Sequence, residues 1–254
     1  MAYGSASPRK VLVICIVVVL RVVLVLGLIA SYEALTHEDT LHTYFVRLTA
    51  KKPDLATRAH LPDDMRATAQ EATDDFARKD YDAAAACYQR ILNKYPESLY
   101  AWSNLGVIRF TAGDLDGART ALEKCVAMAP DDAFSRTYLG MTYYQLSRYD
   151  EALAMLEEAI SLDPGDAKSH DFLGCCLSQK GRQLDAEREF KKAIELDSHS
   201  SDAYFNLALL CERTGDLLQA IGYWNVYLKL DATSSWASAA RKQLDRLKKS
   251  LRSK

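Results

Sequence analysis

The sequence repeats itself every 34 residues, and this period restricts the fold more than any other feature. Alanine recurs at that step at Ala84, Ala118, Ala152, Ala186 and Ala220. Three further series keep the same step: Leu105, Leu139, Leu173 and Leu207; Gly106, Gly140 and Gly174; and Pro96, Pro130 and Pro164. A fixed period of this size indicates an array of similar units, each of which buries its apolar face on the next.

Two stretches carry a recognisable motif within the period. They are Trp102-x2-Leu105-Gly106 and Ala186-x3-Phe190, and a proline closes three of the units. On these residues the chain resembles the tetratricopeptide repeat family. The resemblance implies an all-α superhelical solenoid of helix–turn–helix repeats that acts as a protein-binding scaffold.

The period divides the chain into segments. We predict five repeats within residues 63–234, at 65–98, 99–132, 133–166, 167–200 and 201–234, followed by a basic capping helix over 235–254. Ahead of them we predict a cytoplasmic N-terminus over 1–10, a transmembrane signal anchor over 11–30 and a partly helical connector over 31–62. The first and fifth repeats are atypical, as expected of terminal units.

Each repeat has its own turn and its own close helix contact. The first helix of each unit should end at Lys79, Gly113, Ser147, Gly181 or Gly215, where a left-handed backbone can cap it. The recurrent small residues should let the two helices approach, with large residues filling the space beside them: Tyr88, Leu122, Leu156, Phe190 and Trp224. Arg109 departs from the repeat pattern, and Tyr143, Asp114, Asp116 or solvent could satisfy it.

The segment 11–30 is long and apolar enough to span a bilayer. Sixteen of its twenty residues are Val, Leu or Ile, and about 20 such residues cross the hydrocarbon core. One central arginine, Arg21, costs roughly 2.5–3.5 kcal/mol on the insertion scale, which sixteen apolar residues outweigh. Arg21 either extends to the interface along its own stem or pairs with a membrane partner.

Flanking charges predict the orientation of that span. Arg9 and Lys10 precede it, whereas 31–46 contains no Lys or Arg, so the N-terminus should be cytoplasmic and the repeats outside the cytoplasm, periplasmic or extracytoplasmic. A cleaved signal peptide is disfavoured because Leu28-Ile29-Ala30 is a poor cleavage site. Five thiols beyond the span, with no CxxC spacing, leave a cytoplasmic array as the alternative.

The sequence contains no convincing catalytic, cofactor or metal motif. His37 and His42 resemble a zinc-protease pair, but they are five residues apart rather than four and would point in different directions on a helix. GxSxG, P-loop and GxGxxG motifs are absent from the sequence. We therefore predict no enzyme, no cofactor, no metal site and no small-molecule substrate.

By the resemblance, the first helices should line a concave groove that binds peptides. The predicted groove residues are Tyr100, Asn104, Val107, Phe110, Phe134, Tyr138, Met141, Tyr144, Phe172, Phe205, Asn206 and Leu209. Their aromatic members should form one stripe, either as core between repeats or as contacts for a ligand. A clamp for a C-terminal carboxylate is disfavoured because Ser103 and Val107 stand where Lys and Asn would be needed.

The charge distribution indicates which kind of partner is favoured but does not identify the partner. The whole chain is −2, which does not favour nucleic acid, yet residues 65–240 hold 27 acidic and 18 basic residues while 241–254 holds seven basic residues and Asp245. We predict a membrane-tethered interaction scaffold that binds client or assembly proteins through apolar segments in the groove. The alternative is a permanent structural subunit of a larger membrane or envelope complex. The basic end is either a solvated helix or a contact for an anionic surface or acidic partner.

Overall fold

The computed structural model describes residues 62–252, and all regular elements in that part of the chain are α-helices. They are α4 (Asp63–Ala77), α5 (Tyr81–Lys94), α6 (Leu99–Ala112), α7 (Leu115–Met128), α8 (Ala133–Gln145), α9 (Tyr149–Leu162), α10 (Ala167–Gln179), α11 (Gln183–Leu196), α12 (Ser201–Thr214), α13 (Leu217–Leu230) and α14 (Ser235–Arg252). We term α4, α6, α8, α10 and α12 the first helices, and α5, α7, α9, α11 and α13 the second helices.

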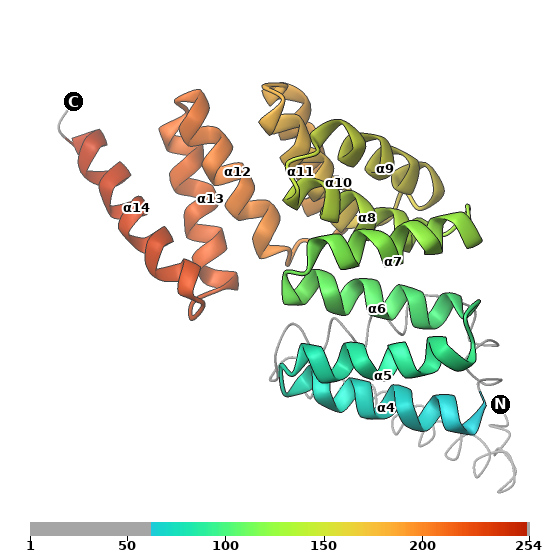
Figure 1. The fold of residues 1–254 in the computed structure, drawn as a ribbon. Helices are drawn as coiled ribbons and strands as arrows, with labels where there is room; N and C mark the ends of the chain where they lie inside the picture. Colours follow the sequence, from blue (N-terminus) through green and yellow to red (C-terminus); the bar gives the residue numbers. More distant parts are fainter. Residues whose placement is uncertain (1–61, 253–254) are drawn as a thin grey trace, which may run out of the picture. The chain divides into compact units, whose positions relative to one another are not determined.

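The helices stack in chain order (Figure 1). Each first helix packs on the second helix that follows it, and each second helix packs on the next first helix. The first helices α6, α8, α10 and α12 also contact one another in succession. Residues 62–252 therefore form an all-α solenoid, in which each unit buries its apolar surface on its neighbours.

Short polar side chains begin most of these helices. Ser98 Oγ accepts a hydrogen bond from the backbone N–H of Ala101 at 3.3 Å, and Asp114 Oδ1 accepts one from Gly117 at 3.0 Å. Each such bond satisfies an N–H group that has no partner inside the helix. The helices α9 and α11 follow arginines instead, and their side chains pair with Glu151 and Asp185 in the first helical turn.

The predicted turn residues all adopt the left-handed backbone conformation. The φ angles are +82° at Gly113, +77° at Gly181 and +86° at Gly215. Lys79 and Ser147 take φ angles of +62° and +59° although they carry a Cβ atom. This confirms the sequence prediction, and it places the two non-glycine turns under backbone strain of about 1–2 kcal/mol each.

In the second, third and fourth repeats, a glycine of the first helix lies directly against a large residue of the second helix. A Cβ atom added to Gly140 would lie 2.7 Å from Leu156 Cγ, and one added to Gly106 would lie 2.7 Å from Leu122 Cγ. A Cβ atom added to Gly174 would likewise lie 2.7 Å from Phe190 Cδ1. Since real Cβ atoms do not approach this closely, glycine is required at these crossings, as the 34-residue series predicted.

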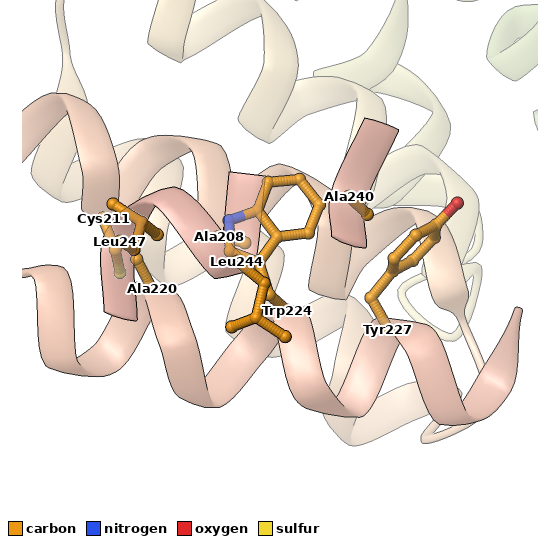
Figure 2. Packing of buried hydrophobic residues seen from close by; sticks show 8 residues of the cluster. All are labelled: Ala208, Cys211, Ala220, Trp224, Tyr227, Ala240, Leu244 and Leu247. Atoms are coloured by element: carbon orange, nitrogen blue, oxygen red, sulfur yellow. The ribbon is translucent and has the colours of Figure 1, made fainter. Parts of the chain in front are cut away.

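The helix α14 covers the apolar surface of the fifth repeat. Figure 2 shows the buried cluster that it completes, formed by Ala208, Cys211, Ala220, Trp224, Tyr227, Ala240, Leu244 and Leu247. Glu212 fixes the helix in place, because it accepts hydrogen bonds from Trp224 Nε1 at 2.6 Å and from Gln243 Nε2. Helical spacing in the sequence predicts an inward face of Trp236, Ala240, Leu244 and Leu247. Ala240, Leu244 and Leu247 are buried as predicted, but the prediction was wrong for Trp236, which is 64 % exposed, and the basic side chains between residues 241 and 249 are exposed as well.

Arg109 finds its partner within its own repeat. Its Nε atom lies 3.7 Å from Asp114 Oδ2, just beyond the turn that ends α6. The arginine side chain is one third exposed. Of the partners considered from the sequence, the structure therefore selects Asp114, together with partial solvation, and no buried unpaired charge arises.

The structure contradicts the predicted localisation as a single-pass membrane protein. None of the helices within residues 62–252 combines the length and the apolar character needed to cross a membrane. The helices α8 and α4 have 13 and 15 residues, whereas a span needs about 20, and the longer α14 carries six basic residues. The predicted span 11–30 with Arg21 lies outside the described residues, and the placement of the repeats outside the cytoplasm is withdrawn.

The glycine crossing leads to a first prediction. Gly140→Leu should lower the free energy of unfolding by about 1–3 kcal/mol or more, because the new side chain overlaps Leu156. Gly165→Leu should change it far less, since the nearest atom to a Cβ there is Asp163 Oδ1 at 3.3 Å in an exposed turn. Thermal unfolding followed by circular dichroism measures both. Equal melting temperatures would contradict this packing.

The strained turn leads to a second prediction. Ser147→Gly should raise the free energy of unfolding by about 0.5–1 kcal/mol, because relief of the left-handed strain exceeds the entropy that glycine loses on folding. Ser103→Gly, in the middle of α6, should lower it by a similar amount. Chemical denaturation of both variants provides the comparison. A destabilised Ser147→Gly variant would show that the turn is not strained.

Candidate protein-binding surface

We define the first-helix face as the surface on α6, α8, α10 and α12 to which the twelve predicted groove residues belong. Val107, Tyr138 and Met141 are buried, with 4–5 % of their surface exposed. Leu209 is exposed. The remaining eight are half-buried: Tyr100, Asn104, Phe110, Phe134, Tyr144, Phe172, Phe205 and Asn206. The three buried residues thus hold the helices together and offer little surface to a partner.

The aromatic rings of this face meet across neighbouring first helices. Phe110 on α6 contacts Tyr138 on α8 with ring centroids 6.0 Å apart, and Phe134 contacts the same tyrosine at 4.7 Å. Tyr144 on α8 contacts Phe172 on α10 at 5.8 Å. The Phe110–Tyr138 and Tyr144–Phe172 pairs meet edge to face and add to the packing between repeats, whereas Phe134 and Tyr138 lie on the same helix with their rings tilted. Half-buried rings such as Phe134 and Phe172 therefore serve the core with one side and remain accessible on the other.

The rings do not form the single stripe expected from the sequence. Phe205 turns away from the neighbouring repeat and contacts Trp224, Tyr227 and Trp236 at 5.1–6.0 Å. The reason is its place in the repeat, because the residue in phase with Tyr138 and Phe172 is Asn206 rather than Phe205. A shift of one residue rotates a side chain by about 100° around a helix, which brings the half-buried Phe205 against the apolar cluster of the last repeat.

A polar cluster interrupts the aromatic groups between α10 and α12. Asp171 Oδ1 accepts a hydrogen bond from Asn206 Nδ2 at 3.0 Å, and the same amide nitrogen lies 3.3 Å from Cys175 Sγ. The ammonium group of Lys168 lies 5.6 Å from the centroid of the Tyr138 ring. Asp202, on α12, is the exposed acidic residue of the cluster. Two carboxylates and one ammonium group therefore share this part of the first-helix face.

Burial shifts the ionisation of this cluster. It raises the pKa of Asp171 to about 7; the hydrogen bond from Asn206 opposes this and the charge of Asp202 adds to it. Burial also lowers the pKa of Lys168 to about 8, against the attraction of Asp166, Asp202 and Asp171. Both charged forms are thus poorly solvated near neutral pH, which is typical of functional sites although not restricted to them.

Asp171 is not among the binding residues predicted from the sequence. Its counterparts at steps of 34 residues are Ala69, Ser103, Thr137 and Phe205, none of which is charged. The sequence does contain a signal for this residue, because Asp171 is the charged member of a series whose other members are uncharged. Its environment could not be read from the period, because it depends on Asn206 and Asp202 from the next repeat.

The described cysteines are free thiols, and most of them are buried. Burial raises the pKa of Cys125 and Cys176 to about 12 and that of Cys211 to about 11. A thiol in this state is a poor nucleophile and a poor metal ligand. Cys125 and Cys211 therefore act as small apolar side chains.

Within residues 62–252, one group of potential metal-ligand atoms occurs, where Glu71, Asp75 and Cys87 have ligand atoms within 4.8 Å of one another. Arg78 pairs with Asp75, and Arg90 pairs with Glu71. Burial raises the pKa of the Cys87 thiol, and the hydrogen bond from Arg90 opposes that shift. Arginines thus already neutralise both carboxylates, and the arrangement is that of a structural ion-pair network.

Family models for tetratricopeptide repeats match this chain in three places, at residues 76–138, 133–199 and 189–222. Together they span residues 76–222, more than half of the chain. The chain therefore belongs to the tetratricopeptide repeat proteins. Among curated proteins, no sequence matches it.

Solved structures with the same fold come from several proteins. TTC0263, a tetratricopeptide repeat protein of Thermus thermophilus, has 21 % sequence identity and a TM-score of 0.62, covering 72 % of this chain and 98 % of its own. PilF of Pseudomonas aeruginosa has 20 % identity and a TM-score of 0.62, with coverages of 73 % and 85 %. YrrB, described as having an unusual peptide-binding site, has 19 % identity and a TM-score of 0.52, with coverages of 69 % and 90 %.

The buried carboxylate leads to a third prediction. The folded-state pKa of Asp171, about 7, lies above the value of 3.8 for an unperturbed aspartate, so the folded chain holds this proton more tightly than the unfolded chain. Asp171 therefore lowers stability as pH rises from about 4 to about 7, with the full penalty above that range. Asp171→Asn should raise the free energy of unfolding at about pH 8, on the order of 1 kcal/mol or more.

The same variant should gain less at about pH 5, where the Asp171 carboxyl is largely protonated in the folded chain. Glu157→Gln, which removes an exposed carboxylate from α9, is the control and should show little change at either pH. Urea denaturation at the two pH values measures the difference. A destabilised Asp171→Asn variant at about pH 8 would mean that the charge strengthens the fold.

Proposed function

We propose that this protein is an interaction scaffold that binds apolar segments of partner proteins on its first-helix face. The observation that carries the proposal is the row of half-buried aromatic side chains on successive first helices, including Tyr100, Phe134 and Phe172. Packing between repeats uses one side of these rings and leaves the other exposed. Exposed aromatic groups that recur on neighbouring helices are typical of interaction sites.

The chemistry of the face favours an internal segment over a free C-terminus. The positions at which a carboxylate clamp would need Lys and Asn hold Ser103 and Val107, and Val107 is buried. Aromatic rings supply large contact areas with few rotatable bonds, so they suit the side chains of an extended or helical apolar segment. The peptide-binding site named for YrrB, which shares this fold, is consistent with this use of a repeat array.

No catalytic role is proposed. The one buried carboxylate of the face, Asp171, lies beside an amide and a thiol that burial keeps protonated. This set lacks a base paired with a nucleophile. The function that fits these residues is recognition of a partner rather than conversion of a substrate.

The test uses rings that are accessible. Phe134→Ala combined with Phe172→Ala should reduce co-purification of partner proteins by roughly tenfold or more, because each buried aromatic anchor contributes about 2 kcal/mol or more. Tyr138 is left unchanged because it is buried in the fold. Quantitative mass spectrometry of proteins captured by the full-length chain measures the loss.

The control is Leu184→Ala combined with Leu218→Ala. Both leucines are highly exposed on the second helices α11 and α13, so this double variant removes two exposed apolar side chains that do not belong to the first-helix face. Circular dichroism should show the same helix content for both double variants. Partner capture that survives the phenylalanine changes, or that falls equally in the control, would refute the proposed surface.

A further inference from the structure

The last helix, α14, occupies the place of a first helix. The four first helices before it begin at a strict interval of 34 residues, at Leu99, Ala133, Ala167 and Ser201. The helix α14 begins at Ser235, one further step along, and it packs on α13 as each first helix packs on the second helix before it (Figure 1). The first-helix face therefore continues onto α14.

The other side of α14 is suited to water or to a charged partner rather than to another repeat. Within residues 62–252 no second helix follows α14. In α6, Leu105 and Gly106 are buried, and Gly106 lies against the second helix of its own repeat. The residues in phase with them on α14 are Arg241 and Lys242, and both are exposed. This side of α14 thus remains available for contact.

Trp236, in the first turn of α14, is the exposed aromatic side chain of this surface. It is 64 % exposed, whereas the other large hydrophobic side chains exposed among the described residues are leucines. Trp236 is in phase with Tyr100 and Phe134 of the first-helix face. Its ring meets that of Phe205 edge to face, with centroids 6.0 Å apart. Tryptophan is enriched among the residues that dominate binding energies, so its place at the end of this face points to a ligand contact.

The basic side chains of α14 differ from those of the repeats in their lack of acidic partners. Salt bridges hold most arginines of the repeats, such as Arg119 and Arg148. On α14, Arg246 lies 3.6 Å from Glu212 Oε2. Three further cations of the helix form no salt bridge with any residue of the described part of the chain: Lys242, Lys248 and Lys249. Positive charge is therefore left unneutralised on α14.

Helical spacing brings the tryptophan and several of the cations onto one side of α14. Residues three or four apart are neighbours on a helix surface, and five exposed residues follow one another at such steps: Trp236, Ala239, Lys242, Arg246 and Lys249. We term this row the α14 stripe. Its member Arg246 is in phase with Phe110 and Tyr144, so the stripe borders the first-helix face.

We infer that the α14 stripe binds an acidic segment of a partner protein, with one large apolar side chain of that segment packed on Trp236. The inference rests on the proposed function, because the stripe continues the first-helix face. The carboxylates of the segment extend from Trp236 toward the C-terminal end of α14, along Lys242 and Lys249. Charge complementarity speeds association and disfavours basic segments, while the indole ring supplies the apolar contact.

A selection experiment with a defined probe tests the inference. Random linear peptides displayed on phage are selected on the immobilised full-length protein, and the enriched sequences are aligned. We expect one large apolar residue at a fixed position, with two or more Asp or Glu residues on one side of it. An enriched peptide is then synthesised with a fluorescent label, and its affinity is measured by fluorescence anisotropy at low and at high salt.

Variants of the stripe separate the apolar contact from the charges. Trp236→Ala should weaken binding of this peptide by roughly tenfold or more at either salt concentration. Lys242→Gln combined with Lys249→Gln should weaken it by roughly threefold or more at low salt, and should reduce its dependence on salt, because exposed charge pairs are modest and screened.

Two matched variants serve as controls. Lys124→Gln combined with Lys192→Gln removes the same charge from exposed positions on α7 and α11, and Leu218→Ala removes an exposed apolar side chain from α13. Both should bind the peptide as the wild type does. Circular dichroism of every variant checks that the helices are retained.

The outcomes distinguish this inference from the proposed function. Enriched apolar peptides without acidic residues, weakened by Phe134→Ala with Phe172→Ala but not by Trp236→Ala, would overturn the inference and leave the proposed function intact. Acidic peptides that depend on Trp236 but not on the two phenylalanines would support the stripe and refute the proposed use of the aromatic row.

Three other results would also overturn the inference. Equal loss of binding in the lysine control would mean that net charge alone attracts the peptide. Vesicles of anionic lipid or a single-stranded oligonucleotide that bind through the stripe, when no acidic peptide is enriched, would assign it to another class of partner. A selection that enriches no peptide would count against the inference and the proposed function together.

Discussion

The close crossing of the two helices within a repeat is the constraint on which the rest of this structure depends. At Gly140 a single methyl group would come within 2.7 Å of Leu156 Cγ, so the helices touch backbone against side chain. That contact fixes how the two helices of one repeat pack together. Because each repeat stacks on the next, the same packing recurs along the solenoid. The first helices consequently lie side by side, which is what brings residues from distant parts of the sequence onto one face.

The same geometry explains why similar residues have different roles in neighbouring repeats. Phe172 and Phe205 both belong to first helices, but they differ by one position within the repeat. Phe172 contacts Tyr144 of the preceding first helix, whereas Phe205 packs against Trp224 of its own repeat. Successive residues point about 100° apart around a helix. A shift of one position is therefore enough to exchange a contact with the preceding first helix for a contact within the same repeat. Variation of a binding face therefore needs no change in the fold.

The polar cluster at Asp171 shows how such variation is limited by stability. A solenoid with several glycine-based crossings and capped helices can tolerate one unfavourable buried carboxylate, because its stability is a sum over many neighbouring contacts. Asn206 lessens the penalty through its hydrogen bond at 3.0 Å. Charge can thus be placed on a surface otherwise built from aromatic rings.

The sequence by itself determined the period, the helix pairs, the glycine crossings and the five left-handed turns. All of these features are local or follow from the strict 34-residue period. Even the turns at Lys79 and Ser147 adopt the left-handed conformation that the period predicts, although neither residue is glycine. The sequence could not determine whether Tyr138 is accessible, which partner Arg109 takes, or that Asp171 accepts a hydrogen bond from Asn206 of the next repeat. Those outcomes depend on side chains from different helices meeting in space, and the tertiary structure alone brings these together.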